Sequence, residues 1–507
     1  MRFADDPIGV FRLYPAEQFA TMIMTQNTVC DKRYIRGERR KVSEQTELKK
    51  EMRARDIWCL ALGAMIGFGC FVLPGNSFLP EAGPLGAALG LAIGAGMVMI
   101  ISLSFSYLIR RMPLSGGPFV YAAACFGKVH GFIMGWSLIL TFWALVPLNA
   151  TALGLIGRNL FPGVLQRGFL YNIAGFEVYL GEIAVALVFL IGTAAVNLRG
   201  GKSAGWTQTA ITFGLVGSVL LVAAGVLASG LDFSNLTPLF PEGVGAFRAT
   251  FAVVAMAPWA FVGFDCIPQA AEEFDFPPKR ALRIMLSAIA IAGLMYITVN
   301  TATAVVRPWT EILAEDWATG AAVKDVLGNF GLFFVGLAMT CAVLSGMNAF
   351  LLSASRLFYA MSTLDAMPKW FGKLDEKTAV PKTAILFLTV LSMAAPLLGR
   401  QVINWVVDMT SVGASLSFAY SCAAAMKLAK RCGEKKWFLS GAAGLLLSVF
   451  FLGLLLIPGA PGFLSSPSLI ALAAWTAFGI VIFRIVGKKF MASPALDQML
   501  SRQMKEK

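Results

Sequence analysis

The sequence predicts an all-α membrane protein with many transmembrane helices, and three observations lead to this fold class. Of the 507 residues, 57% are hydrophobic and only 14% are charged, whereas a soluble domain has about 25% charged residues. The mean hydropathy is +0.71. Apolar runs of about 18 residues or more recur along the chain, and each is long enough to cross a bilayer as a helix.

Twelve apolar segments can be recognised. They lie at residues 57–75, 84–109, 130–159, 178–198, 205–229, 248–268, 281–306, 330–361, 382–399, 403–427, 437–457 and 467–487. We therefore predict twelve transmembrane helices in one domain (57–487), between a polar N-terminal tail (1–56) and a short C-terminal tail (488–507). No cleavable signal peptide is expected because the first apolar segment begins too late; translation could also start at Met22 or Met24.

The distribution of basic residues predicts the orientation. If the N-terminus is cytoplasmic and the chain crosses twelve times, 36 of the 42 Lys and Arg residues fall in cytoplasmic segments and 6 in outer segments. Basic residues concentrate on the cytoplasmic side of membrane proteins. Both tails are therefore expected in the cytoplasm, with the protein in the cell membrane. Topology and contact with anionic lipid explain the net charge of +13, so no nucleic-acid partner is expected.

Two of the apolar segments carry residues that interrupt helices. The stretch 63–75, GAMIGFGCFVLPG, contains four glycines, each of which weakens a helix by about 1 kcal/mol relative to alanine. The stretch 251–280 is interrupted by Pro258, Gly263 and Pro268. These are the first and sixth segments, so they open two halves of five segments each. Broken helices at matching positions of two halves are typical of transporters built from an inverted repeat.

The two interruptions together predict a substrate site. Unwound backbone is tolerated at membrane depth only where it lines a cavity. The N–H groups of Phe68, Gly69 and Cys70, at the start of a half-helix, are expected to bind a carboxylate. Carbonyl groups at Met65 and at residues 259–262 are expected to accept from an ammonium group. An α-amino acid carries both groups; the alternative is that the glycines only allow close helix packing.

Five stretches resemble the amino acid–polyamine–organocation (APC) permeases. They are residues 63–75, 112–136, 251–274, 344–371 and 406–420. The resemblance covers roughly residues 50–430. It implies a five-plus-five inverted repeat similar to that of the leucine and arginine transporters, with broken helices 1 and 6.

The resemblance also implies site residues. The carboxylate-binding amides fall on Phe68 and Gly69, and the amine-binding carbonyls on Met65, Trp259 and Val262. An aromatic gate over the substrate falls on Trp259 or Phe261. The full predicted substrate-binding set is Met65, Gly67, Phe68, Gly69, Trp259, Ala260, Phe261, Val262 and Gly263.

The expected coupling ion is a proton. Asp265 is the candidate carrier, since ionisable groups at membrane depth are costly and often functional; the alternative is that it caps freed amides. Many proton-coupled members of the family carry a lysine in helix 5, whereas the aligned position here is about Gly214, which puts that account in doubt. The family's NP-containing loop after helix 6 is replaced by EEFDFPPKR (272–280).

Other polar residues give weaker predictions. Oxygens of Thr340, Ser345 and Asn348 in the eighth segment could hold sodium against carbonyls of the first segment, or could serve helix packing. Asn149 in the third segment could reach the substrate side chain.

A gate is predicted at the end of the sixth segment. Glu272 and Glu273 are expected either to form a salt bridge with Arg110, Arg111 or Lys279, or to be solvated.

These residues predict a secondary active transporter of amino acids that works by alternating access, as a proton symporter or an exchanger. A polyamine or organic-amine permease, a sodium-coupled symporter and a channel on the same fold are the alternatives. An enzyme is not expected, because the chain has one histidine and neither an HExxH motif nor a P-loop. No cofactor or metal is expected. The bulky apolar residues at the site favour a neutral substrate.

Overall fold

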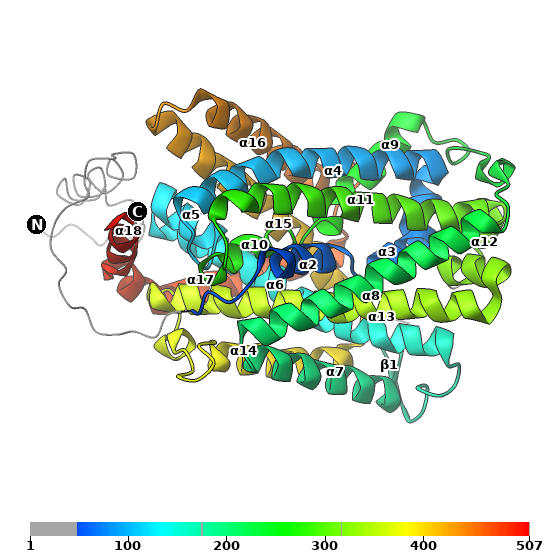
Figure 1. Cartoon of the computed structure of the whole chain (residues 1–507), viewed down its shortest axis with the longest axis horizontal. Coiled ribbons are helices and arrows are strands. Elements are labelled where there is room, and N and C mark those ends of the chain that lie inside the picture. The colour runs from blue at the N-terminus through cyan, green and yellow to red at the C-terminus, as the bar shows by residue number, and fades with distance from the viewer. Residues whose placement is uncertain (1–47, 174–175, 316, 506–507) are drawn as a thin grey trace, which may run out of the picture.

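The computed structural model is a bundle of long helices that run side by side (Figure 1). It describes residues 48–173, 176–315 and 317–505. Most of the predicted N-terminal tail therefore lies outside the described residues.

The helices and strands follow one another in this order: α2 (Ala54–Met65), α3 (Gly69–Leu73), the π-helix η1 (Pro74–Phe78), α4 (Leu79–Arg111), α5 (Pro118–Phe126), α6 (Lys128–Leu160), β1 (Phe169–Ile173), β2 (Phe176–Tyr179), α7 (Leu180–Leu198), α8 (Gly201–Ala228), η2 (Phe233–Leu236), α9 (Ala246–Ala260), α10 (Cys266–Gln269), η3 (Ala271–Glu273), η4 (Pro278–Arg280), α11 (Ala281–Val305), α12 (Trp309–Ile312), α13 (Ala318–Thr363), η5 (Lys369–Gly372), α14 (Lys382–Met393), η6 (Ala395–Leu398), α15 (Gly399–Arg431), α16 (Lys435–Leu456), α17 (Ser466–Ala492) and α18 (Ala495–Lys505).

Nine helical stretches in the described part of the chain are long and apolar enough to cross a membrane. Two shorter apolar stretches, Ala246–Ala260 and Lys382–Leu398, join them. Each predicted apolar segment overlaps one of these stretches; the first two share the run Ala54–Arg111. The protein is thus a multi-pass membrane protein. The count of twelve crossings stays a prediction.

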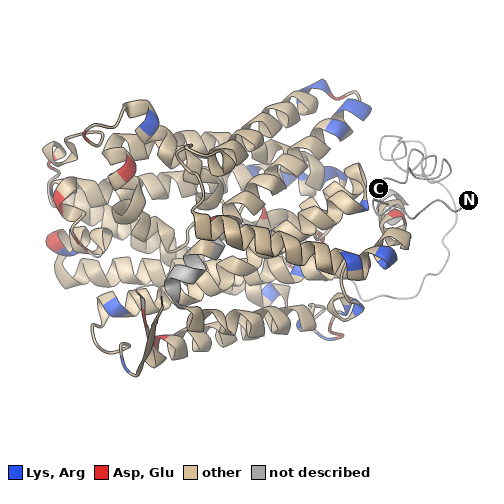
Figure 2. Ribbon diagram, turned by 180° about the vertical axis from the view of Figure 1, so that it is seen from behind, with Lys and Arg blue, Asp and Glu red and all other residues tan. Residues whose placement is uncertain are grey.

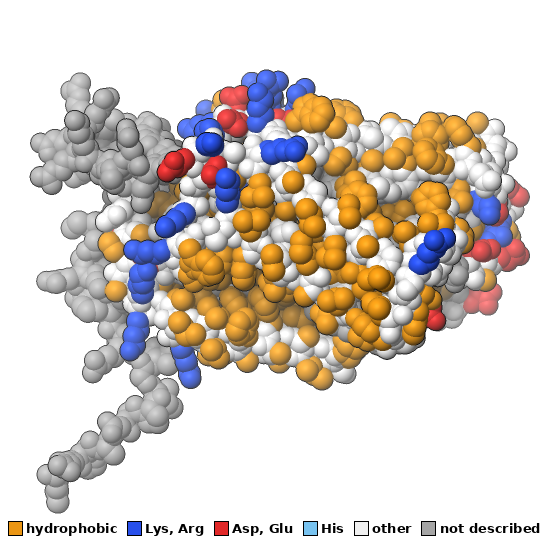
Figure 3. Space-filling model, turned by 90° about the horizontal axis from the view of Figure 1, so that it is seen from below, with side chains coloured by type: hydrophobic (Ala, Val, Ile, Leu, Met, Phe, Trp, Pro, Cys, Tyr) orange, Lys and Arg blue, Asp and Glu red, His pale blue; other side chains and the backbone are white. Residues whose placement is uncertain are grey.

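The two ends of the bundle differ from its middle. We call them the α18 end, where α18 lies, and the hairpin end, where the strands lie (Figure 1). Basic residues gather toward the α18 end, while acidic and basic residues mix at the hairpin end (Figure 2). On the face seen in Figure 3, hydrophobic side chains spread over much of the surface between the two ends. On α17, for example, Ile470 and Ile485 are 70% and 71% exposed. Such a belt is suited to lipid.

The small hairpin was not predicted from the sequence. Strands β1 and β2 pair in antiparallel register, with Tyr171 opposite Val178. The Tyr171 hydroxyl donates to the carbonyl of Leu397 in η6. The strands have only 5 and 4 residues, so their alternation is too short to stand out between long apolar segments.

The broken helices lie inside the bundle. Helix α2 packs against α8, α11 and α13, while α9 packs against α4. Helix α13 also packs along α6 and α8. The unwound stretches are therefore surrounded by protein, which is the condition for irregular backbone at membrane depth.

Candidate functional site

The first predicted break is present at residues 66–68. Helix α2 ends at Met65, and Ile66 leaves the helical region with φ −92° and ψ 85°. Helix α3 begins at Gly69. One detail of the prediction is wrong: the N–H of Cys70 donates to the carbonyl of Gly67 at 3.2 Å. That amide is already engaged and is not a free carboxylate donor.

The second break covers residues 261–265, between α9 and α10. Gly263 has φ +135°, a conformation that L side chains rarely adopt. A Cβ atom at this position would lie 2.7 Å from the Cβ of Ala64 and from the N of Met65. Glycine is therefore required here by both the backbone conformation and the close approach of the first broken helix. The two breaks are in direct contact.

A small pocket lies between the breaks. It is lined by Ala64, Met65, Gly67, Phe68, Leu145, Leu148, Asn149, Trp259, Val262, Tyr296 and Phe350. Five of the nine residues of the predicted substrate-binding set line it, together with Asn149. None of the lining side chains is charged.

The other four residues of the predicted set pack around the pocket. Ala260 and Phe261 are buried, and Phe261 contacts Tyr296 with ring centroids 6.1 Å apart. Gly263 contacts α2 as described above. A Cβ atom on Gly69 would lie 2.2 Å from the ring of Trp259. Gly69 thus makes room for the indole ring of Trp259.

Two carbonyls predicted to bind an amine already accept hydrogen bonds. The carbonyl of Met65 accepts from the Tyr296 hydroxyl at 3.1 Å. The carbonyl of Trp259 accepts from the N–H of Val262 at 3.2 Å. The Trp259 carbonyl also accepts from the N–H of Phe261. A carbonyl oxygen has two lone pairs, so the Met65 carbonyl can still accept one further bond. Tyr296 was not predicted, because nothing in the apolar run of α11 distinguishes it from a core aromatic residue.

The pocket carries one acceptor and one donor without a partner in the described part of the chain. The Asn149 Nδ2 donates to the carbonyl of Leu145 at 2.7 Å, which fixes the amide. Its Oδ1 is buried and unpaired, and lies 3.6 Å from the position of a Cβ on Gly67. The indole N–H of Trp259 is likewise buried and unpaired. A zwitterion could supply a partner for each group.

Asp265 bonds one amide within the second break, but its side chain does not cap α10. Its Oδ1 accepts from the N–H of Gly263 at 2.9 Å. Its Oδ2 is buried and has no hydrogen-bond partner among the described residues. The role of Asp265 as a proton carrier stays a prediction.

Ser345 and Asn348 do not line the pocket. The Oγ of Ser345 accepts from Gln208 Nε2 at 2.5 Å, and the Nδ2 of Asn348 donates to Gln208 Oε1 at 2.8 Å. The Thr340 hydroxyl donates to the carbonyl of Gly336 in its own helix. The predicted sodium ligands are thus engaged in protein hydrogen bonds, and Gln208 was missed from the sequence.

The position aligned with the family lysine does not face the first break. Gly214 is exposed, and its nearest neighbour outside the helix backbone is the Sγ of Cys341. The side chains of α8 that face α2 come from Gln208, Thr209 and Thr212. These three side chains are neutral.

The predicted gate pair has a different partner. Glu273 is buried, and it forms a two-pronged pair with Arg356 of α13: Nε to Oε1 at 2.7 Å and Nη2 to Oε2 at 3.1 Å. The predicted partner Arg111 pairs with Glu434 instead. Both the predicted partners and the solvated alternative are therefore wrong for Glu273. The sequence alone did not identify Arg356, because it lies in a helix predicted to cross the membrane.

Comparison with known proteins agrees with this geometry. A family model described as "Amino acid permease" matches residues 55–483. The branched-chain amino acid permease BcaP of Bacillus subtilis is 24% identical over 77% of this chain and 83% of its own length. The histidine permease HisP of Lactococcus lactis is 26% identical (74% and 79%), and the lysine-specific permease LysP of Escherichia coli is 26% identical (69% and 72%). The chain is a transporter rather than an enzyme, and it belongs to the amino acid permease family of the APC superfamily.

Proposed function

We propose that this permease carries an α-amino acid with a neutral, apolar side chain across the cell membrane by alternating access. The observation that carries the proposal is the pocket between the two helix breaks. Both breaks contribute to its wall, and charged side chains are missing from its lining. A site formed by two discontinuous helices is the usual arrangement in transporters of this architecture.

The polar groups of the pocket suit the two ends of an amino acid. The Oδ1 of Asn149 and the second lone pair of the Met65 carbonyl can accept from an ammonium group. The indole N–H of Trp259 can donate to a carboxylate. Gly67 leaves space beside Asn149 for the backbone of the substrate. An amine without a carboxylate would leave the donor unpaired, which argues against a polyamine.

The remaining walls suit an apolar side chain. Leu145, Leu148, Val262 and Phe350 surround the rest of the pocket, and a charged side chain placed among them would lose its hydration without a partner. The name of the relative BcaP, a branched-chain amino acid permease, supports the same class. The names of HisP and LysP make histidine and lysine the alternatives to test.

We further propose twelve crossings in a five-plus-five repeat, with both termini in the cytoplasm. The gathering of Lys and Arg at the α18 end supports this orientation (Figure 2). The position of the two broken helices at the start of two five-segment halves supports the repeat. A proton symporter or an exchanger is preferred over a sodium symporter, because the oxygens of Ser345 and Asn348 already make protein hydrogen bonds.

The test is uptake of labelled leucine, isoleucine, valine, histidine, lysine, glutamate and putrescine into proteoliposomes. Each substrate is measured with an inward proton gradient, with an inward sodium gradient, with unlabelled amino acid inside, and with none of these. We expect saturable uptake of the branched-chain amino acids, driven by protons or by exchange. Preferential uptake of lysine, glutamate or putrescine would reject the substrate class. Uptake that neither saturates nor concentrates would indicate a channel.

A further inference from the structure

A buried polar cluster lies where α2, α7, α8 and α13 meet. Its centre is Gln208 of α8, which is fully buried. The Nε2 of Gln208 donates to the carbonyl of Cys59 at 3.1 Å and to the Oγ of Ser345 at 2.5 Å. Its Oε1 accepts from the Nδ2 of Asn348 at 2.8 Å. Both N–H donors and the acceptor of this one amide are therefore used.

Further bonds extend the cluster to its neighbours. The Thr212 hydroxyl also donates to the Cys59 carbonyl, at 3.2 Å. The Oδ1 of Asn348 accepts from the Nδ2 of Asn197 of α7 at 2.8 Å. A second side chain of α8 and a side chain of α7 thus join the same network. The carbonyl of Cys59 belongs to α2, so the network reaches the backbone of the first broken helix.

Gly63 allows α2 to lie against this cluster. A Cβ atom on Gly63 would be 1.7 Å from Ser345 Oγ, 2.5 Å from Gln208 Nε2 and 2.9 Å from Thr212 Oγ1. Any other residue here would force either these side chains or α2 to move. Gly63 lies two residues before Met65, which ends α2 and lines the pocket. The cluster therefore holds the end of α2 that forms the pocket wall.

We propose that Gln208 is a positioning residue that holds the pocket end of α2 against α8 and α13 in the arrangement seen here, and that it does so without any change of charge. This deepens the proposed function and rests on it for the consequences on transport. An amide at the centre provides two donors and one acceptor at fixed positions, which a hydroxyl or an ionisable group cannot do. Loss of this amide would remove three buried hydrogen bonds at once, which is costly. The Cys59 carbonyl would keep the bond from Thr212, and the Asn348 Nδ2 would keep its bond to the carbonyl of Ala204 at 3.2 Å.

The ionisable groups around the cluster do not contact Gln208 through their side chains. Asp56 of α2 accepts from the Thr209 hydroxyl, and Cys59 contributes only its carbonyl. Cys341 of α13 lies beside Gly214, and Tyr296 of α11 is bonded to Met65. The contact between α2 and α8 can therefore open and close without binding or releasing a proton at Gln208.

The first test uses hydrogen–deuterium exchange of the whole purified protein without substrate. Gln208→Ala is expected to speed exchange in peptides covering residues 54–65 by about fivefold to tenfold, because the variant loses hydrogen bonds that hold α2. The matched control is Thr207→Ala, a neighbouring half-buried position on α8. Unchanged exchange in residues 54–65 of Gln208→Ala would overturn the positioning role. This readout needs no transport, so it stands even if the proposed substrate is wrong.

The second test measures leucine uptake in proteoliposomes. In Gln208→Ala the KM is expected to rise by about threefold to tenfold with little change in the maximal rate, because a smaller fraction of the protein has the closed pocket. A fall in maximal rate at unchanged KM would contradict this.

A third test uses Gln208→Glu and measures how uptake depends on pH. The protonated acid can donate one O–H, whereas the carboxylate would face the Cys59 carbonyl as a buried charge. Uptake by Gln208→Glu is expected to fall as pH rises from 5 to 8, relative to the wild type and to Gln208→Ala. A constant ratio of Gln208→Glu to wild type across this range would reject the proposed contact.

Discussion

The ion pairs at the two ends of the bundle are built differently. At the α18 end, the side chains of Arg356 and Glu273 are 0% and 3% exposed. At the hairpin end, those of Arg158 and Glu182 are 22% and 15% exposed. Removing one partner of a buried pair leaves an uncompensated charge, whereas water screens a partly exposed one. Breaking the Arg356–Glu273 pair should therefore cost more stability than breaking the Arg158–Glu182 pair.

Backbone contacts strengthen the difference at the α18 end. The N–H of Met52, just before α2, donates to the carbonyl of Glu273 at 3.0 Å, and the N–H of Asp275 donates to the carbonyl of Met52 at 2.9 Å. A Cβ atom on Gly201 would lie 2.4 Å from the Oε2 of Glu273. Glu273, which pairs with Arg356 of α13, thus also bonds the residue just before α2 and lies close to the start of α8.

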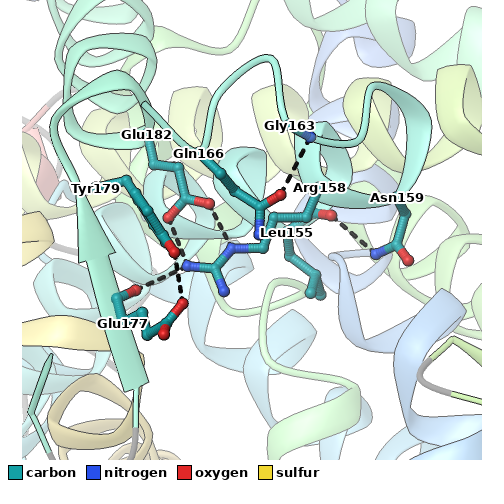
Figure 4. Close-up of polar contacts among 8 residues, drawn as sticks. All are labelled: Leu155, Arg158, Asn159, Gly163, Gln166, Glu177, Tyr179 and Glu182. Atoms are coloured by element: carbon teal, nitrogen blue, oxygen red, sulfur yellow. Dashed lines mark hydrogen bonds and ion pairs between the residues drawn. The ribbon is translucent and has the colours of Figure 1, made fainter. Parts of the chain in front are cut away.

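The pair at the hairpin end is a smaller, local unit (Figure 4). Arg158 bonds Glu182 through Nε and Nη2, and its Nη2 also donates to the carbonyl of Glu177 at 2.8 Å. Its guanidinium lies 5.4 Å from the centre of the Tyr179 ring. These contacts join α6 to β2 and to the start of α7. They stabilise the hairpin without reaching either broken helix.

The largest effect is expected from Arg356→Ala. It leaves Glu273 charged and buried, which costs about 3–5 kcal/mol, so the purified protein should unfold at a clearly lower temperature and take up little substrate. The measurement is thermal unfolding together with uptake. The matched control is the double variant Arg356→Met, Glu273→Leu, because replacing both partners by apolar groups is often neutral. If Arg356→Ala unfolded at the same temperature as the wild type, the claim that the buried pair contributes more to stability would be wrong.

A smaller effect is expected from Arg158→Ala. The pair is partly exposed, so the loss should be about 1–2 kcal/mol, between the values for surface and buried pairs. The thermal unfolding temperature should fall less than in Arg356→Ala, and leucine uptake should be retained. The control is Glu182→Gln, which removes the charge of the partner of Arg158 and keeps its shape. If Arg158→Ala abolished uptake while the protein stayed folded, the hairpin end would be part of the gate.

The smallest effect concerns a pair at the α18 end whose basic partner is well exposed, Asp375 with Lys382; their side chains are 17% and 47% exposed. The Lys382 ammonium and two hydrogen bonds from Thr378 lower the pKa of Asp375. A carboxyl whose pKa is lowered in the folded state stabilises that state at pH values above its unfolded pKa of about 3.9. This stabilisation is lost as the pH falls through the pKa of the folded state.

The difference in unfolding temperature between the wild type and Asp375→Asn should therefore be small and constant from pH 8 to 5, and should begin to shrink only below about pH 4. This variant separates burial from location, since it lies at the same end as Arg356. If Asp375→Asn lowered the unfolding temperature as much as Arg356→Ala, the position of a pair at the α18 end, and not its burial, would determine its contribution to stability.

Much of the site was predictable because its backbone needs particular residues. The glycines of 63–75 and the Pro–Gly pattern of 251–280 predicted both breaks, and five of nine predicted residues line the pocket. Residues whose role depends on a distant partner were missed. Tyr296, Gln208 and Arg356 look like ordinary members of their helices until α11, α8 and α13 are placed beside the breaks.

The membrane class and the positions of both helix breaks could be predicted from the order of residues alone. Apolar run length and the conformational preferences of glycine and proline act locally, so they can be read without knowing the fold. Which charges pair, which carbonyls are already engaged, and which face of α8 meets α2 depend on how the helices pack. Arg356 and Glu273 are 83 positions apart, and the bonds from Gln208 to Cys59 and from Tyr296 to Met65 span 149 and 231 positions. The energies of these contacts depend on burial, which the order of residues does not specify.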